Sequence, residues 1–249
     1  MEYIERSYRS MFVSDDMTHF QVSVKDTDLD IGVSRECYSN ELVEAARKIT
    51  TSLRNELEAY IEFDPEFKSA LVPHRLYSTA PPIAFEMAKA AELANVGPMA
   101  AVAGAFSEYI GRELLKYSPD VIIENGGDLY IHTDKKRHVG IFAGSSPFTN
   151  KIAVEVLPEF GPIGLCTSSG TVGPSLSFGK ADAAVVMAQT GSIADAVATA
   201  VGNMIHIPED VNRGVEFAAN IPGVLGAIAI KDEKMALWGK IKIVRLNFN

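Results

Sequence analysis

Two short stretches near the start of the chain, residues 8–13 and 18–24, alternate between apolar and polar side chains. Such alternation is typical of a β-strand with one buried face, and the polar residues 14–16 between them suit a turn, so the pattern predicts a β-hairpin. After an acidic stretch at 26–30, the spacing becomes that of an amphipathic helix that starts after Ser39 and ends at Asp64-Pro65. Its apolar positions are Leu42, Val43, Ala46, Ile49, Leu53, Leu57 and Ile61.

Two further helices are predicted in the middle of the chain. The first begins at Pro81-Pro82 and ends at 95–97, and the second follows Pro98 and spans 99–117. The second helix is rich in small residues, namely Ala100, Ala101, Ala103, Gly104 and Ala105. We expect another backbone or a ligand to lie against this face, because Gly104 destabilises a helix unless a close contact offsets the cost.

The second half of the chain is rich in predicted strands. Four of them, at 121–124, 129–132, 139–143 and 152–157, are separated by turn residues and suggest an antiparallel meander. Another strand at 183–188 leads into an apolar helix at 191–205, and the last strands are predicted at 224–230, 235–238 and 241–246. The pattern as a whole predicts an α+β fold. We expect one domain over residues 1–249, with two intertwined α+β halves as the alternative.

Charge and cysteine content narrow the class of protein. The chain has 249 residues and a formal net charge of −9, which disfavours binding to a nucleic-acid backbone. Its two cysteines, Cys37 and Cys166, form no CxxC pair and suit a reducing compartment. The N-terminus lacks the apolar core of a signal peptide, and no later run is long and apolar enough to span a bilayer. We therefore expect a cytoplasmic protein without a membrane partner.

The apolar helix at 191–205 carries a polar pair, Asp195 and Thr199, four residues apart. On a helix this spacing stacks the carboxylate over the hydroxyl, and a hard cation such as Mg²⁺ suits two oxygen ligands with little water around them. A structural interpretation stands beside this one. Ser192 and Asp195 fit a capping box, and Thr199 can bond the Asp195 carbonyl.

Two turns or loops add candidate binding residues. Asn125-Gly126-Gly127-Asp128 is a strong two-residue hairpin signal, and its glycines would also let a ligand approach the backbone while Asp128 bonds a ribose or adenine edge. The loop predicted at 166–175 is dense in hydroxyls and glycine and offers donors to a pyrophosphate, although such residues are common in loops for their turn geometry alone.

Four segments in chain order, at 97–104, 124–128, 166–170 and 194–200, resemble motifs of the ApbE-type FAD:protein FMN transferases. The chain is more similar still to a group of cytoplasmic ApbE-like proteins. The resemblance implies an ApbE-like fold, with Asp195 and Thr199 as Mg²⁺ ligands and Asp195 at the catalytic centre. It also implies a flavin-nucleotide site formed by Gly104, Gly126, Gly127, Asp128, Thr167, Ser168 and Gly170.

The activity implied by the resemblance is Mg²⁺-dependent binding of FAD and transfer of FMN to a threonine of a protein acceptor. Two motifs of the family differ here: Ala103-Gly104 replaces a Lys-Gly pair, and residues 174–182 replace a His-x-x-Asp-Pro segment, where Lys180 and Asp182 are candidate substitutes. The alternatives are a non-catalytic protein that binds flavin or another nucleotide, and an enzyme with an unrelated small-molecule substrate on the same scaffold. Small-residue faces and short exposed strands also suggest a homodimer.

Overall fold

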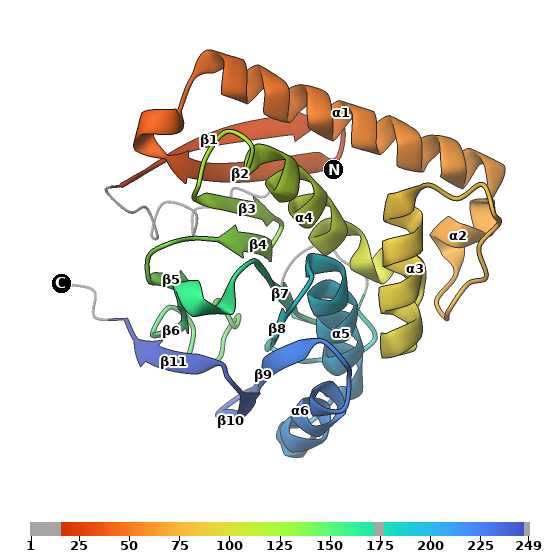
Figure 1. The fold of residues 1–249 in the computed structure, drawn as a ribbon. Coiled ribbons are helices and arrows are strands. Elements are labelled where there is room, and N and C mark those ends of the chain that lie inside the picture. The colour runs from red at the N-terminus through yellow and green to blue at the C-terminus, as the bar shows by residue number, and fades with distance from the viewer. Residues whose placement is uncertain (1–15, 172–176, 247–249) are drawn as a thin grey trace.

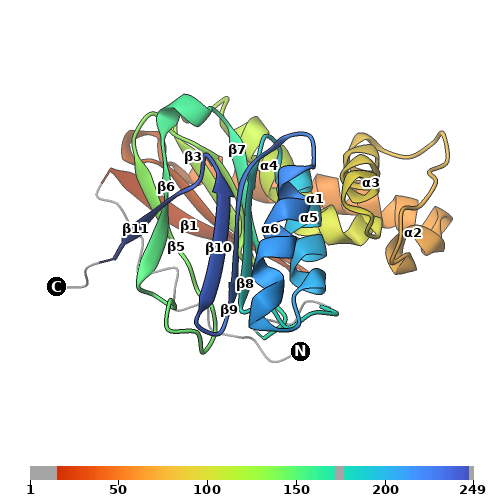
Figure 2. The same ribbon diagram turned by 90° about the horizontal axis from the view of Figure 1, so that it is seen from below.

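The computed structural model describes residues 16–171 and 177–246, which form three layers. Helices cover one face of an eight-stranded sheet, and a three-stranded sheet covers the other face (Figures 1 and 2). The larger sheet has the order β1-β2-β3-β4-β7-β8-β9-β10, the smaller one has the order β11-β6-β5, and all neighbouring strands are antiparallel. This is an α+β fold, as the sequence predicted.

The bounds of the elements are as follows. The helices are α1 (Asn40–Phe63), α2 (Pro65–Ser69), α3 (Pro82–Ala94), α4 (Val102–Leu114), α5 (Gly191–Met204) and α6 (Val211–Ala219). The strands are β1 (Met17–Val24), β2 (Thr27–Ser34), β3 (Val121–Asn125), β4 (Asp128–His132), β5 (Arg137–Gly140), β6 (Ile152–Val156), β7 (Ile163–Ser168), β8 (Ala183–Ala188), β9 (Val224–Lys231), β10 (Lys234–Gly239) and β11 (Lys242–Arg245).

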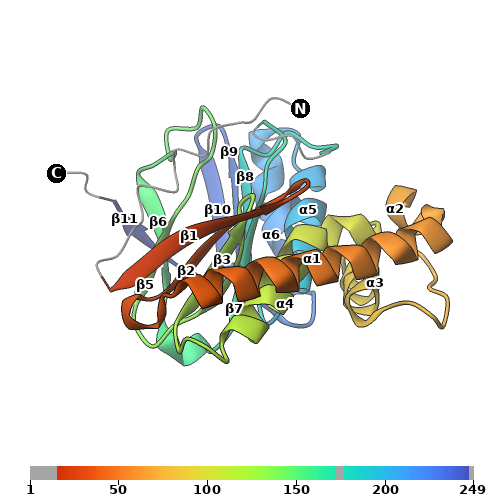
Figure 3. The same cartoon turned by 90° about the horizontal axis from the view of Figure 1, so that it is seen from above.

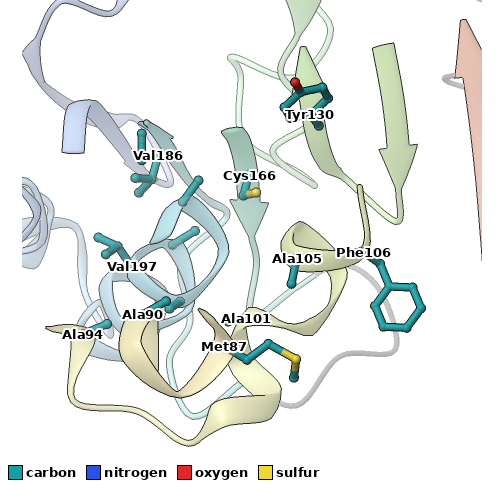
Figure 4. Close-up of a cluster of buried hydrophobic side chains, with 14 of the residues drawn as sticks. Met87, Ala90, Ala94, Ala101, Ala105, Phe106, Tyr130, Cys166, Val186 and Val197 are labelled. Carbon is teal, nitrogen blue, oxygen red and sulfur yellow. The ribbon is translucent and has the colours of Figure 1, made fainter. Parts of the chain in front are cut away.

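The central strands are buried on both faces, and their side chains alternate between two hydrophobic cores. In β8 the even-numbered residues pack under the helices, whereas the odd-numbered residues pack against the three-stranded sheet. The same alternation in β7 places Cys166 under the helices and Leu165 on the opposite side. Figure 4 shows Cys166 between Val197 of α5 and Ala105 of α4. The helix-side face of β7 therefore forms the floor beneath these two helices.

The long helix α1 spans one end of the helix layer, where it packs against β1 and α4 (Figure 3). Its start is capped by the Ser39 hydroxyl, which accepts a hydrogen bond from the Leu42 N–H at 3.2 Å. Four of its predicted positions, Leu42, Ala46, Leu53 and Leu57, are buried. Val43, Ile49 and Ile61 are half-buried, and Thr50 and Tyr60 are buried although the pattern did not include them. The predicted helix boundary at Asp64-Pro65 is also confirmed.

Helices α4 and α5 touch through their backbones. A Cβ atom built on Gly104 would lie 2.2 Å from the Gly191 carbonyl oxygen, and one on Gly191 would lie 2.3 Å from the Gly104 carbonyl oxygen. Real Cβ atoms do not come so close to backbone atoms, so both positions require glycine. The expectation that a backbone or a ligand lies against the small-residue face is met here by a backbone.

The predicted hairpin between residues 8–13 and 18–24 stays a prediction, because residues 8–13 lie outside the described residues. In the structure β1 pairs with β2, which covers most of the acidic stretch at 26–30 and was not predicted as a strand. Two other expectations about strands are wrong. The predicted meander is divided between two sheets, because β4 pairs with β7 instead of β5. Thr167 and Ser168 belong to strand β7 and not to a loop. Sequence-local patterns could not show these pairings, because the partners are distant in the chain.

None of the helices in the described ranges is of a length and hydropathy that would let it cross a membrane.

The Gly104→Ala variant should have a free energy of unfolding about 2 to 3 kcal/mol below that of the wild type, because the overpacked backbone contact outweighs the better helix propensity of alanine. Urea unfolding followed by circular dichroism measures this. Gly214→Ala in α6 is the matched control, since its Cβ would meet side-chain atoms and no backbone, the nearest being Val201 Cγ1 at 3.0 Å. The control should stay within about 1 kcal/mol of the wild type. Equal effects of the two changes would contradict the proposed contact.

Candidate active site at the crossing of α4 and α5

The start of α5 is fixed by residues that differ from the predicted capping box. The N-cap is Thr190, whose hydroxyl accepts a hydrogen bond from the Ile193 N–H at 3.3 Å. Ser192 is buried, and its hydroxyl has no hydrogen-bond partner among the residues that the structure describes. The capping-box interpretation of Ser192 and Asp195 is therefore wrong, which leaves the Asp195 carboxylate for another role.

The carboxylate of Asp195 binds the start of the neighbouring helix. Its Oδ2 accepts a hydrogen bond from the Gly104 N–H at 2.9 Å, and the Ala103 N–H is a second backbone donor to the same carboxylate. Burial raises the pKa of Asp195 to about 7, and the two backbone donors oppose this rise. Asp195 forms no ion pair with a lysine or arginine within the described ranges. It is thus a buried acid held by main-chain donors alone.

Glu108 on α4 makes the reciprocal contact. Its Oε2 accepts a hydrogen bond from the Gly191 N–H at 2.8 Å, and the Ser192 N–H also donates to this carboxylate. The other oxygen pairs with Arg112 one turn further on. Burial raises the pKa of Glu108, while the charge of Arg112 and the backbone donors lower it. Each of the two helices therefore supplies a carboxylate that caps the N-terminus of the other.

Glu108 is the functional candidate that the sequence analysis missed. A signal for it exists, because Gly104 and Glu108 have the same spacing as Gly191 and Asp195, a glycine followed four residues later by an acid. Both pairs lie in small-residue helices, and in both the glycine N–H binds the acid of the opposite helix. This shared spacing identifies Glu108 only once the structure shows that the two helices cross at Gly104 and Gly191.

Asp128 lies across from Asp195 on the floor of this region. The predicted two-residue turn is confirmed, with positive φ angles of 71° at Gly126 and 104° at Gly127 and with Asn125 paired to Asp128. Asp128 stands opposite Cys166 in the sheet register and has a pKa raised well above its usual value, first by burial and then by the negative charge of Asp195. The two acids come from different elements and repel each other.

The remaining predicted nucleotide-binding residues are only partly brought together. Ser168 lies on the helix side, where its Oγ would be 3.2 Å from a Cβ on Gly202 of α5. The Thr167 side chain belongs to the opposite face by strand alternation, although its carbonyl oxygen faces the turn, 3.8 Å from a Cβ on Gly127. Gly170 is exposed and its N–H donates to the Ala181 carbonyl at 2.9 Å. Of the predicted loop, residues 172–176 lie outside the described residues.

Thr199 lies one helical turn beyond Asp195 and is partly buried. Its hydroxyl has no hydrogen-bond partner among the described residues, so the alternative bond to the Asp195 carbonyl is not formed. A hydroxyl on the same helical face as a buried carboxylate remains available to a ligand. The structure thus places Asp128, Asp195 and Thr199 around the same part of α5.

Other candidate groups have different roles. Asp182 accepts a hydrogen bond from the Asp232 N–H at 2.6 Å and pairs with Lys231 at 3.5 Å, so it fixes the β9–β10 turn. Lys180 is exposed. Burial and the charges of Asp128 and Asp195 raise the pKa of the Cys166 thiol, which therefore stays protonated and unreactive.

The described residues form no cluster of three or more His, Cys, Asp and Glu side chains that could hold a metal ion. A magnesium site made of one Asp, one Thr and backbone carbonyls or water contains fewer than three such side chains, so this finding does not bear on Asp195 and Thr199. Two surface pockets lie elsewhere, one between α6 and β10 and one beside β6 and β11, and none of the predicted site residues lines them.

Comparisons with known proteins agree with this architecture. A family model described as "AbpE bacteria" matches residues 9–229, and the chain belongs to this family. A UPF0280 protein of Methanothrix thermoacetophila is 42% identical over 209 residues, which cover 83% of this chain and 87% of the relative. A UPF0280 protein of Methanopyrus kandleri is 39% identical over 237 residues, covering 92% and 94%. The predicted family resemblance is confirmed.

Two solved structures share the fold. The apo form of the flavinyl transferase ApbE from Pseudomonas stutzeri matches with a TM-score of 0.54 at 10% identity, covering 89% of this chain and 93% of that chain. The apbe protein of Thermotoga maritima matches with a TM-score of 0.51 at 14% identity, covering 91% and 96%. At these identities the likeness shows the ApbE-like α+β fold.

The pKa of Asp195 predicts a pH dependence of stability in metal-free buffer. Between pH 4 and pH 7 the folded chain holds a proton on Asp195 that the unfolded chain has released, so the free energy of unfolding should fall as the pH rises across this interval. Urea unfolding at a series of pH values with a chelator present measures the slope, and Asp195→Asn should flatten it.

Glu155→Gln is the control for this measurement. Hydrogen bonds from Lys242 and other basic groups lower the pKa of Glu155 to about 2, so its stabilisation is lost only as the pH falls below its ordinary pKa. The control should change the acid limb of the profile and leave the interval from pH 5 to pH 7 as in the wild type. An unchanged slope in Asp195→Asn would refute the assignment to Asp195.

Proposed function

We propose that the chain binds Mg²⁺ and a flavin nucleotide at the crossing of α4 and α5, and that it transfers FMN from FAD to a threonine of an acceptor protein. The observation that carries the proposal is the pair of the buried Asp195 and the half-buried Asp128. Burial raises the cost of ionising Asp195, burial and the charge of Asp195 raise that of Asp128, and no basic side chain is paired to either among the described residues. A bound divalent cation would offset this cost.

The residues present fit Mg²⁺. The donors are hard oxygens, and Asp195 keeps lone pairs for a cation although its Oδ2 accepts the Gly104 N–H. Thr199 has a hydroxyl available on the same helical face. Mg²⁺ usually keeps several waters and needs few protein ligands, so an Asp–Thr pair on one helix is a sufficient anchor when a pyrophosphate supplies further oxygens.

The other candidate residues then have defined roles. The turn at Gly126 and Gly127 lets the nucleotide approach the backbone. Asp128 accepts a hydrogen bond from a hydroxyl or amino group of the nucleotide. Ser168, the last residue of β7, has a hydroxyl that donates toward the phosphates, and Gly170 lets them approach the backbone, because its own N–H is bonded to the Ala181 carbonyl. In the transfer, the threonine oxygen forms a bond to the phosphorus of the FMN portion, the bond between the two phosphates breaks, and AMP leaves. Mg²⁺ would stabilise the charge that develops on the leaving phosphate.

Family membership and fold support the proposal. One solved structure of this fold is described as a flavinyl transferase, and the relatives match nearly the full chain. A cytoplasmic location and a homodimer stay predictions, with the free thiols of Cys37 and Cys166 consistent with a reducing compartment.

A second candidate function is binding of the flavin nucleotide without transfer. It is favoured by one observation, namely that Ala103 occupies the position of the family's lysine and contributes only its N–H to Asp195. The two functions share the binding site and differ in the release of AMP.

The proposal predicts that the purified wild type binds FAD in the presence of Mg²⁺ and releases AMP when an acceptor peptide with a threonine is added. Asp195→Asn and Thr199→Val should each lower the Mg²⁺-dependent affinity for FAD by more than about 100-fold, beyond the effect of losing an outer contact, because the first removes the charge of a ligand and the second removes a ligand oxygen. Flavin fluorescence measures binding and chromatography measures AMP.

Matched controls come from the exposed surface. Asp26→Asn and Thr51→Val make the same chemical changes far from the crossing and should bind FAD as the wild type does. Binding without AMP would select the second candidate function. Failure of the wild type to bind FAD with Mg²⁺ would overturn both.

A further inference from the structure

The contacts between α4 and α5 are reciprocal to an unusual degree. A Cβ on Gly104 would meet Gly191 and the Asp195 Cβ, the latter at 2.8 Å, while a Cβ on Gly191 would meet Gly104 and the Glu108 Cβ, the latter at 3.3 Å. Each glycine is thus covered by the glycine and the acid of the other helix. The two hydrogen bonds, Gly104 N–H to Asp195 and Gly191 N–H to Glu108, close this arrangement at both ends.

Further contacts also hold the first turn of α5 in place. Gly191 is also pressed against strand β7, because a Cβ on Gly164 would lie 2.5 Å from the Gly191 Cα. Its N–H points at the buried carboxylate of Glu108, and the neighbouring Ser192 N–H does the same. Any displacement of this turn would carry Asp195 with it, since residues four apart on a helix are held at a fixed distance along its axis.

We propose that Glu108 is a positioning residue for the metal site: by holding the first turn of α5, it sets the place of the Asp195 carboxylate relative to Asp128 and the β3–β4 turn. This inference rests on the proposed function, because it assigns Glu108 a role in the same Mg²⁺ site. Glu108 itself does not contact the ion. It acts through the Gly191 and Ser192 amides, as outer groups commonly do around metal ligands.

The role depends on an acceptor oxygen at the Gly191 N–H and not on the charge. Glu108→Gln keeps an oxygen that can accept this hydrogen bond, whereas Glu108→Ala removes it and leaves two buried amides without an acceptor. If Glu108 had only a structural role, its removal would weaken Mg²⁺ binding no more than another substitution that lowers the free energy of unfolding equally. If Glu108 positions Asp195, its removal weakens Mg²⁺ binding more than the lost stability explains.

The experiment titrates magnesium chloride by calorimetry into the full chain with FAD present, because the pyrophosphate supplies further Mg²⁺ ligands, and subtracts the same titration into FAD alone. We expect Glu108→Ala to weaken Mg²⁺ binding 10-fold to 100-fold, the range typical for outer-shell partners, and Glu108→Gln to stay within about 3-fold of the wild type. Ile110→Val, a buried change on the same helix, is the control for lost stability and should bind Mg²⁺ as the wild type does.

A second readout needs no metal. Hydrogen exchange of the Gly104 amide reports the bond to Asp195, and it should be faster in Glu108→Ala than in Ile110→Val, because the Asp195 acceptor shifts only in the first variant. If the wild type binds no Mg²⁺, the proposed function fails and the inference fails with it. If the wild type binds Mg²⁺ but Glu108→Ala binds it equally and protects the Gly104 amide equally, the inference alone is overturned.

Discussion

The crossing of α4 and α5 is the contact on which the rest of this structure depends. Gly104 and Gly191 let the two backbones touch, and this closeness brings the carboxylate of each helix onto the first amides of the other. Two partly charged helix ends and two buried acids thereby satisfy one another, and no basic side chain of the described ranges is paired to Asp195. A larger side chain at either glycine would separate all four groups at once.

The same contact explains why a functional site is expected here. Any short polar residue at the surface could cap α4. Asp195 is instead buried and has a raised pKa, and it faces Asp128, whose pKa is also raised. A buried acid beside a half-buried one that it repels costs stability, and such a cost is commonly retained where a ligand needs the groups. The turn at Gly126 and Gly127 leads directly into Asp128, and Thr199 follows Asp195 by one turn of α5.

Much of the secondary structure could be predicted from periodicity, because helix α1, the Gly-Gly turn and helix α5 are specified by residues close together in the chain. The pairing of β4 with β7 and the split into two sheets depend on contacts between distant residues, so local alternation did not show them. Asp195 and Thr199 were recognised as a polar pair on an apolar helix. The pattern does not identify Glu108, because its partner amide belongs to another helix, and it places Thr167 in a loop, because strand β7 extends further than its apolar run.

The most direct test of the account is a crystal of the protein soaked with Mn²⁺ and FAD, in which anomalous scattering locates the ion. The account predicts an ion with the Asp195 carboxylate and the Thr199 hydroxyl at coordination distance, about 2.2 Å, and the flavin nucleotide's phosphates beside it. An ordered flavin nucleotide bound elsewhere, or an Asp195 carboxylate that contacts only the α4 amides in the soaked crystal, would contradict it.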